Sequence, residues 1–296
     1  MLDLFITTIS QGLIFGIGAL GIYLTFRILD FPDLSVDGTF TLGCSVAAII
    51  ILKGYSPFIG IFVAFVAGSL AGMVTGLIHI KGNITEILSG IIVMIGLYSI
   101  NLRIMGKSNI HLFNSEHIFS NRGAIEILVI LTLIAIFLKM IIDVFFKLRI
   151  GYVLKAIGEN EKFVTALGIN PNKIKVIGLM LSNGIVAVSG SLYTQYQGFS
   201  DINMGTGFIV SGLAAVVIGE IVFKKMNIIK FTTIAIIGGV AYKFILMIAL
   251  RLGLAASDLK LITAIMMVII LAKKPSFKIR AKRKMVKPYV KVKQYI

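Results

Sequence analysis

The sequence predicts an all-α, polytopic helical membrane protein, and three observations lead to this fold class. Of the 296 residues, 57% are hydrophobic and only 14% are charged, whereas a soluble domain carries about 25% charged residues. Several apolar runs approach or exceed the roughly 20 residues that a helix needs to cross a bilayer. The runs are continuous rather than alternating, which favours helices over the strands of a barrel.

About nine membrane-spanning segments are predicted from apolar length and from the residues that interrupt the runs. Two of them, 36–52 and 207–223, are short and contain glycine, so a broken or re-entrant segment is an open alternative for both. Residues 1–272 are therefore expected to form one transmembrane domain. The nine segments are 4–26, 36–52, 58–80, 84–105, 125–146, 174–196, 207–223, 228–250 and 259–272.

Basic residues in the loops predict the orientation of the chain. Residues 273–296 hold ten Lys or Arg and no Asp or Glu, within a net charge of +16. A basic cluster directly after an apolar run is typical of a cytoplasmic tail near anionic lipid, so no nucleic-acid partner is expected. The basic loop 147–175, together with Lys224 and Lys225, is also expected inside, and the loops 106–122, 197–205 and 251–258 are expected outside. Nine crossings then place the N-terminus outside the cell membrane and the C-terminus in the cytoplasm.

The sequence contains no constellation typical of an enzyme or a metal site. It has no ATP-binding Walker A loop, no His-Glu-x-x-His, no Gly-x-Ser-x-Gly and no Cys-x-x-Cys. Cys44 is the single cysteine, and His111 and His117 stand six residues apart with no cysteine near them. A transport subunit without its own cofactor is therefore favoured over an enzyme.

A proton- or sodium-coupled transporter is expected to keep ionisable groups deep in its spans. The acids Asp37, Glu86 and Asp143 instead stand near predicted span ends. Asp37 is expected to cap the short helix that follows it. An ion-coupled secondary transporter therefore stays open as the less favoured alternative.

Small residues at four-residue spacing predict close helix packing. Gly68, Gly72 and Gly76 repeat in this way in the third apolar run, and such a spacing lets helix backbones approach closely in lipid. Packing within one subunit is the favoured interpretation, and an interface between subunits is the alternative.

The loop 147–175 contains a short amphipathic segment. A helix is expected to begin at Glu159, Asn160 and Glu161, with apolar side chains on one face at three- and four-residue spacing. Such a helix suits a socket on another protein, and packing against the chain's own spans is the alternative. The candidate contact residues are Gly158, Glu159, Asn160, Glu161, Phe163, Ala166, Leu167 and Gly168.

Residues 154–160 read Leu-Lys-Ala-Ile-Gly-Glu-Asn, and residues 166–170 read Ala-Leu-Gly-Ile-Asn. This stretch resembles the cytoplasmic coupling loop of ABC permeases of the branched-chain amino acid and ribose type. Residues 22–38 and 97–106 are similar to one subgroup, which is associated with tryptophan or tyrosine uptake in Gram-positive bacteria. Branched-chain members carry a different motif where this chain has Val-Asp-Gly at 36–38.

The resemblance implies a permease subunit of an ABC importer that moves a small solute, here tryptophan or tyrosine. It also implies three partners: a second permease copy, forming a homodimer, a cytoplasmic ABC ATPase dimer that carries ATP and Mg²⁺, and an extracellular substrate-binding lipoprotein. A permease for a branched-chain amino acid or a nucleoside is an alternative.

Polar residues on presumed inward faces are the candidates for the substrate path. For each of them, a hydrogen bond between helices is the alternative role. They are Asn101, Ser182, Asn183, Ser189 and Tyr193.

Overall fold

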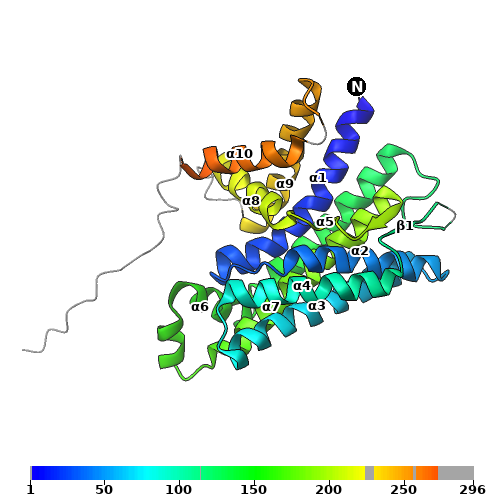
Figure 1. Ribbon diagram of the computed structural model, residues 1–296. Helices are drawn as coiled ribbons and strands as arrows, with labels where there is room; N and C mark the ends of the chain where they lie inside the picture. Colours follow the sequence, from blue (N-terminus) through cyan, green and yellow to red (C-terminus); the bar gives the residue numbers. More distant parts are fainter. Residues whose placement is uncertain (1, 114, 224–229, 256–257, 273–296) are drawn as a thin grey trace, which may run out of the picture.

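The computed structural model describes residues 2–113, 115–223, 230–255 and 258–272. The basic tail 273–296, and Lys224 and Lys225, which the charge pattern places inside, lie outside the described residues. The described part of the chain folds into ten α-helices, one π-helical turn and one two-stranded sheet (Figure 1).

Six helical segments are long and apolar enough to cross a membrane. They are α1 (Leu2–Tyr23) with its π-helical continuation η1 (Leu24–Ile28), α3 (Pro57–Gly82), α4 (Glu86–Met105), α5 (Ala124–Phe145), α7 (Pro171–Gln197) and α9 (Phe231–Arg251). Three shorter apolar helices are α2 (Val36–Leu52), α8 (Phe208–Phe223) and α10 (Leu259–Ala272). The all-α membrane fold is therefore confirmed, and the number of full crossings stays a prediction.

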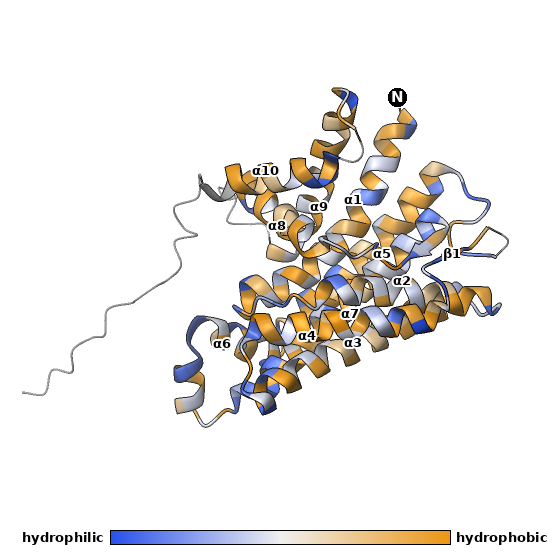
Figure 2. Ribbon diagram, viewed as in Figure 1, coloured by the Kyte–Doolittle hydropathy of each residue, from blue (hydrophilic) through white to orange (hydrophobic). Residues whose placement is uncertain are grey.

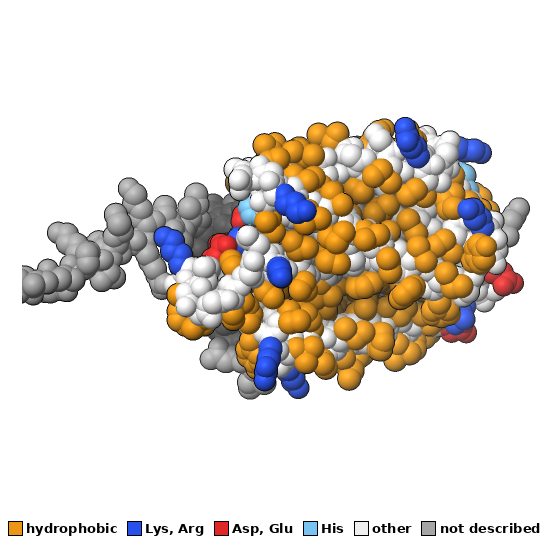
Figure 3. All heavy atoms as spheres, turned by 90° about the horizontal axis from the view of Figure 1, so that it is seen from below, with side chains coloured by type: hydrophobic (Ala, Val, Ile, Leu, Met, Phe, Trp, Pro, Cys, Tyr) orange, Lys and Arg blue, Asp and Glu red, His pale blue; other side chains and the backbone are white. Residues whose placement is uncertain are grey.

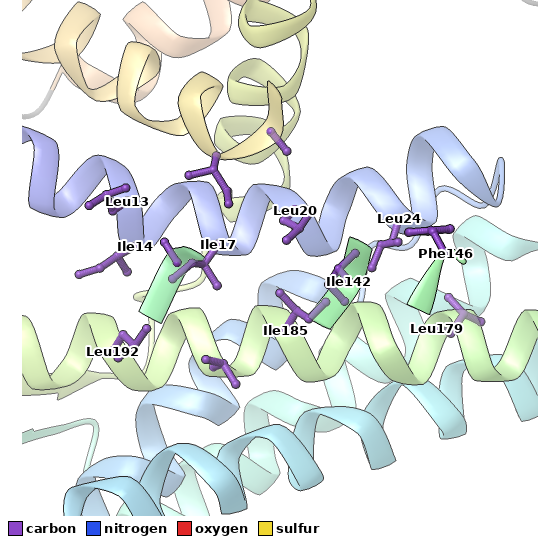
Figure 4. Close-up of a cluster of buried hydrophobic side chains, with 14 of the residues drawn as sticks. Leu13, Ile14, Ile17, Leu20, Leu24, Ile142, Phe146, Leu179, Ile185 and Leu192 are labelled. Carbon is purple, nitrogen blue, oxygen red and sulfur yellow. The ribbon is translucent and has the colours of Figure 1, made fainter. Parts of the chain in front are cut away.

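α7 lies at the centre of the helix bundle. It packs against α1, α2 and α3, and α1 in turn lies between α7 and α9 (Figure 1). Figure 4 shows the contact between α1 and α7, where Ile14, Ile17 and Leu20 face Ile185 and Leu192. These side chains are almost fully buried, so this apolar seam holds the two helices together by packing.

The outer surface of α3, α4 and α5 is apolar. Phe62 on α3, Ile95 on α4 and Phe137 on α5 each expose more than 60% of their surface. Figure 2 shows the same hydropathy along the ribbons, and Figure 3 shows a broad apolar face with Lys and Arg side chains gathered toward its two ends. An apolar surface that extends over three helices is unsuited to water and suits a bilayer.

The glycines of α3 lie against α7 of the same chain. A Cβ atom at Gly72 would meet the Leu179 carbonyl, and one at Gly68 would meet the Asn183 carbonyl. Gly76 lies against Val176. Absent side chains thus allow the backbones of α3 and α7 to approach closely, which is the within-subunit packing that the spacing favours.

The two ends of the bundle differ in structure. At one end, the sheet end, β1 (Asn109–His111) pairs antiparallel with β2 (Phe199–Asp201), which joins the two loops expected outside. At the other, the α6 end, the polar helix α6 (Arg149–Ala166) lies against η1 and α7 (Figure 1). Loops that the charge pattern assigns to one side therefore meet at one end of the molecule.

Both short helices near the bundle centre begin after irregular backbone. The chain leaves the helix after η1, passes through Asp30 at φ 56° and starts α2 at Val36. α8 starts at Phe208, whose ring lies at Gly18 of α1, and Glu220 near its end pairs with Arg27. α8 therefore runs beside only the part of α1 nearer the α6 end, which favours the broken-segment alternative for 207–223.

Candidate functional site

The N-termini of α2 and α8 meet inside the bundle at Asp37. Its carboxylate accepts hydrogen bonds from the backbone N–H of Gly207 at 2.8 Å and of Ile209 at 2.7 Å. The Thr41 hydroxyl accepts another from Gly205 N–H at 3.0 Å. The expectation that Asp37 caps its own helix is wrong, because its side chain instead satisfies the free N–H groups at the start of α8. Interrupted helices whose N-termini meet inside a bundle are a recurring feature of transporter binding sites.

A second buried carboxylate fixes the break before α2. Asp33 accepts hydrogen bonds from the Ser35 backbone N–H at 2.8 Å and hydroxyl at 2.6 Å, and from Asn183 Nδ2 at 2.7 Å. All three residues are almost completely buried. The network ties the irregular segment 29–35 to the middle of α7, twelve residues from its first residue, or about 18 Å along the helix.

Aromatic rings from five helices surround the junction of α2 and α8. Phe40 of α2 stacks on Phe208 of α8 with ring centroids 4.1 Å apart. Phe15 of α1 lies 5.5 Å from Phe208 and 5.7 Å from Tyr193, and Tyr242 of α9 lies 6.4 Å from Phe15. These five residues form the aromatic cluster, which gives the centre of the bundle a large apolar and polarisable surface.

A lysine that the sequence reasoning passed over lies against this cluster. Lys243 Nζ is 3.6 Å from the centroid of the Phe15 ring, within the range of a cation–π interaction. It is the single charged residue between the two ends of α9. A lone cation inside an apolar span is itself a sequence signal for function, so Lys243 could have been identified as a candidate from the sequence.

Four of the five substrate-path candidates make hydrogen bonds between helices or to the α2 break. Ser182 donates to the Gly21 carbonyl at 2.7 Å, and Ser189 donates to the Ile14 carbonyl at 2.7 Å. Asn101 Nδ2 donates to the Gly38 carbonyl at 3.1 Å, while its buried Oδ1 has no partner among the described residues. Asn183 binds Asp33, as above. Of the five, only Tyr193 belongs to the aromatic cluster, so a substrate-contacting role for the others stays a prediction without support from this geometry.

α6 is two helical pieces joined at Asn160, whose backbone at φ −159° and ψ 90° is not helical. The first piece covers 149–159, and the second, here the α6 turn, covers 161–166. The Asn160 side chain accepts a hydrogen bond from the Phe163 backbone N–H at 3.2 Å and so caps the α6 turn. The expected helix start at Glu159, Asn160 and Glu161 is therefore found at Asn160, whereas the helical piece that runs from Arg149 to Glu159 was not expected.

The α6 turn presents apolar side chains to the surroundings. Phe163 is 57% exposed and Leu167 61% exposed, and Ala166 is also exposed between them. Val164 is 1% exposed and holds the turn against the rest of the chain. Glu159 and Glu161 are exposed at the start of the turn, and Gly168 ends it at φ 77°. The candidate contact residues thus lie together on a surface that the described chain leaves uncovered.

Three contacts connect α6 to the membrane helices. Gly158 lies directly on the Ile28 carbonyl, where a Cβ atom has no room. The Leu154 side chain fills the space at Gly178 of α7. The α6 turn is also tied to α7, since Lys175 Nζ pairs with a Glu161 carboxylate oxygen at 2.9 Å. α6 is therefore in direct contact with η1 and with α7.

No metal site accompanies these features in the described part of the chain, which contains no group of three His, Cys, Asp or Glu placed to hold an ion. Asp143, one of the acids considered for ion coupling, is occupied by Lys139 at 2.9 Å, Lys230 at 3.0 Å and the Thr232 hydroxyl at 2.7 Å. These contacts join α5 to the start of α9.

Comparison with known proteins gives a consistent picture. A family model described as the permease component of branched-chain amino acid transport systems matches residues 4–271. A tyrosine transport system permease protein of Clostridioides difficile is 48% identical over 267 residues, covering 90% of both chains. An uncharacterized protein of Rickettsia prowazekii is 34% identical, covering 92% of this chain and 98% of that one. The ribose import permease protein of Escherichia coli K12 is 27% identical, covering 63% of this chain and 60% of that one. No solved structure matches the chain.

Proposed function

The chain belongs to the family of branched-chain amino acid transport permeases, and from this premise we propose that it imports an aromatic amino acid, tyrosine or tryptophan. It acts as the membrane-spanning subunit of an ABC importer and has no ATP site of its own. The tyrosine transport relative, at 48% identity over 90% of both chains, supports the aromatic substrate.

The observation that carries the proposal is the exposed α6 turn. Its apolar side chains Phe163 and Leu167 are more than half exposed although the turn is held in place by a cap and an ion pair. An ordered apolar projection of this kind suits a groove on a partner protein. We assign that groove to a cytoplasmic ATPase subunit that holds ATP and Mg²⁺, so the α6 end is proposed to face the cytoplasm. The C-terminus is proposed to lie on the same side, as its basic residues predict.

The remaining partners follow from the same proposal. A second copy of the chain completes the membrane dimer, so that each copy engages one ATPase subunit. An extracellular binding protein delivers the amino acid to the sheet end, where β1 and β2 join two loops.

The proposed mechanism uses the three contacts of α6. Closure of the ATPase dimer moves the α6 turn, and the contacts at Ile28, Gly178 and Lys175 pass this movement to α1 and α7. α1 packs against α8, and α7 packs against α2. The N-termini of α2 and α8 meet at Asp37. ATP binding and loaded binding protein thus bias one equilibrium between two arrangements of the bundle.

The experiment that tests the function is uptake into proteoliposomes containing the chain, its ATPase and its binding protein. We expect ATP-dependent accumulation of labelled tyrosine or tryptophan, with no accumulation of leucine or a nucleoside. Accumulation of leucine or the nucleoside would correct the substrate. Uptake that needs an ion gradient but no ATP would overturn the ABC assignment in favour of an ion-coupled transporter.

The coupling role of the α6 turn has its own test. Reversing both charges, with Glu159→Lys and Glu161→Lys, or enlarging the exposed side chain with Ala166→Trp, is expected to abolish ATP-driven uptake. The matched control is read out by copurification of the ATPase: Glu116→Lys, at an exposed acid in the loop at the sheet end, should retain the ATPase, and the α6 variants should lose it. Wild-type uptake in both α6 variants would show that the ATPase docks elsewhere.

A further inference from the structure

Two cavities meet at Lys243. The outer cavity, of about 360 Å³, lies beside the first turns of α1 and the end of α9, where Thr7, Gln11 and Arg251 line it. The inner cavity, of about 320 Å³, lies between α1, α8, α9 and α10 beside the aromatic cluster. Lys243 and Leu259 line both cavities. The two volumes are at the lower end of the range for small-molecule sites, so together they suit a small solute.

The charge along these cavities has one sign. Arg251 lines the outer cavity, Lys243 lies between the two, and Lys260 lines the inner one. Among the described residues that line either cavity, none is Asp or Glu. The described part of the chain also places no carboxylate in salt-bridge contact with Lys243, whose ammonium group contacts the Phe15 ring.

Lys243 carries a charge inside an apolar span, where an ionisable group is energetically costly. Lys243 is twelve residues from the start of α9 and eight from its end, or about 18 Å and 12 Å along the helix, so it lies within the apolar part of the span. Ionisable residues inside membrane spans are costly and typically serve a pathway or a ligand. The cation–π contact with Phe15 compensates part of that cost, and no hydrogen-bond acceptor for the ammonium is found among the described residues.

We propose that Lys243 binds the carboxylate of the transported amino acid midway along this path, with the solute's aromatic side chain against Phe15, Phe208 and Tyr242. The inference rests on the proposed function and names the residue that recognises the substrate. The ring of the solute meets the aromatic wall of the inner cavity. The hydroxyls of Thr206 and Ser211, which line the same cavity, offer acceptors for the amino group.

The test is direct binding to the purified full chain in detergent micelles. The chain contains no tryptophan, so bound L-tryptophan can be followed by its own fluorescence. Tryptamine, which has the same ring and amino group but no carboxylate, is the probe for the charge. We expect the wild-type chain to bind tryptophan about tenfold or more tighter than tryptamine, as the loss of a charged hydrogen bond predicts.

Three variants separate a ligand role from a structural one. Lys243→Met is expected to weaken tryptophan binding about tenfold or more and to leave tryptamine binding unchanged, whereas Lys243→Arg retains most of the preference. Lys107→Met is the control, because Lys107 is an exposed cation in the loop at the sheet end. Wild-type affinity in Lys243→Met, equal binding of the two probes to the wild-type chain, or no saturable binding at all would each overturn the proposal.

Uptake in the same variants separates this inference from the proposed function. If Lys243→Met still takes up substrate with ATP and with the wild-type KM, the proposed binding site is wrong and the proposed function stands. If binding depends on Lys243 but the wild-type complex shows no ATP-driven uptake, the proposed function is wrong and the binding site stands.

Discussion

Asp33 and Asn183 form a deeply buried polar contact that joins distant parts of the chain. Their side chains meet at 2.7 Å across 150 residues of sequence, and both are almost fully buried. In lipid, an unsatisfied polar group has no water to replace its partner. The contact therefore fixes the irregular segment before α2 against α7.

A double-mutant cycle with Asp33→Ala and Asn183→Ala should give a coupling free energy of about 0.6–1.7 kcal/mol, the range for hydrogen bonds between membrane helices. The measurement is the free energy of unfolding in mixed micelles for the two single variants and the double variant. Ser189→Ala combined with Asp33→Ala is the control pair, since these residues share no contact and should show additive effects. Additivity for Asp33 and Asn183 would contradict the network.

Gly158 is the residue through which α6 contacts the end of α1. Gly158→Ala should lower stability by about 1–3 kcal/mol, because the new methyl group has no room beside the Ile28 carbonyl. That cost exceeds the 0.5–1 kcal/mol or so that alanine gains over glycine in a helix. Thermal unfolding of the purified variant measures the change.

Gly96→Ala is the matched control for Gly158→Ala, since Gly96 lies within α4 with no atom near its missing Cβ. It should be neutral or slightly stabilising. Equal effects of the two substitutions would mean that the contact at Ile28 carries no strain.

At the scale of helices, the apolar runs predicted the elements well. The predicted run 36–52 has the bounds of α2, and 207–223 differs from α8 by one residue. Length and continuity are sufficient for this because each apolar residue contributes independently to burial in lipid. In α6 the helix start near Asn160 was predicted, and the helical piece 149–159 before it was not.

The cap at Asn160 predicts how α6 responds to substitution. Asn160→Ala should destabilise the α6 turn by about 1 kcal/mol through loss of the bond to the Phe163 N–H. We expect more ATP hydrolysed per amino acid imported, while basal hydrolysis persists. Asn160→Asp retains the acceptor, so it should hydrolyse as much ATP per imported amino acid as the wild type. If both variants hydrolyse more, the cap is not the cause.

At the scale of the whole molecule, the orientation can be tested with single cysteines. Cys44 is buried and is the single cysteine of the chain, so Cys44→Ala provides a background. In intact cells, a membrane-impermeant maleimide should label Lys107→Cys at the sheet end. It should label Lys162→Cys at the α6 end only after permeabilisation. The opposite pattern would invert the proposed orientation, and labelling of both in intact cells would contradict a crossing between them.

Contacts between distant segments could not be predicted from the sequence. β1 and β2 are three residues each and sit in loops without a strand pattern. Asp37 reaches α8 across 170 residues, and no periodicity encodes such a pairing. Lys243 differs, since a lone charge within an apolar run is visible in the sequence and only its neighbours Phe15 and Leu259 required the structure.

The Asp37 contact also sets an order of events during synthesis. The carboxylate is translated 170 residues before the N–H of Gly207 that it binds. At about 5–20 residues per second, the two ends of this bond are separated by roughly 10–30 s. During that interval α2 is completed while the start of α8 does not yet exist. The junction at the centre of the bundle is therefore completed late. In a chain truncated before α8, the Asp37 carboxylate would lack the N–H groups of Gly207 and Ile209 that it binds in the finished protein.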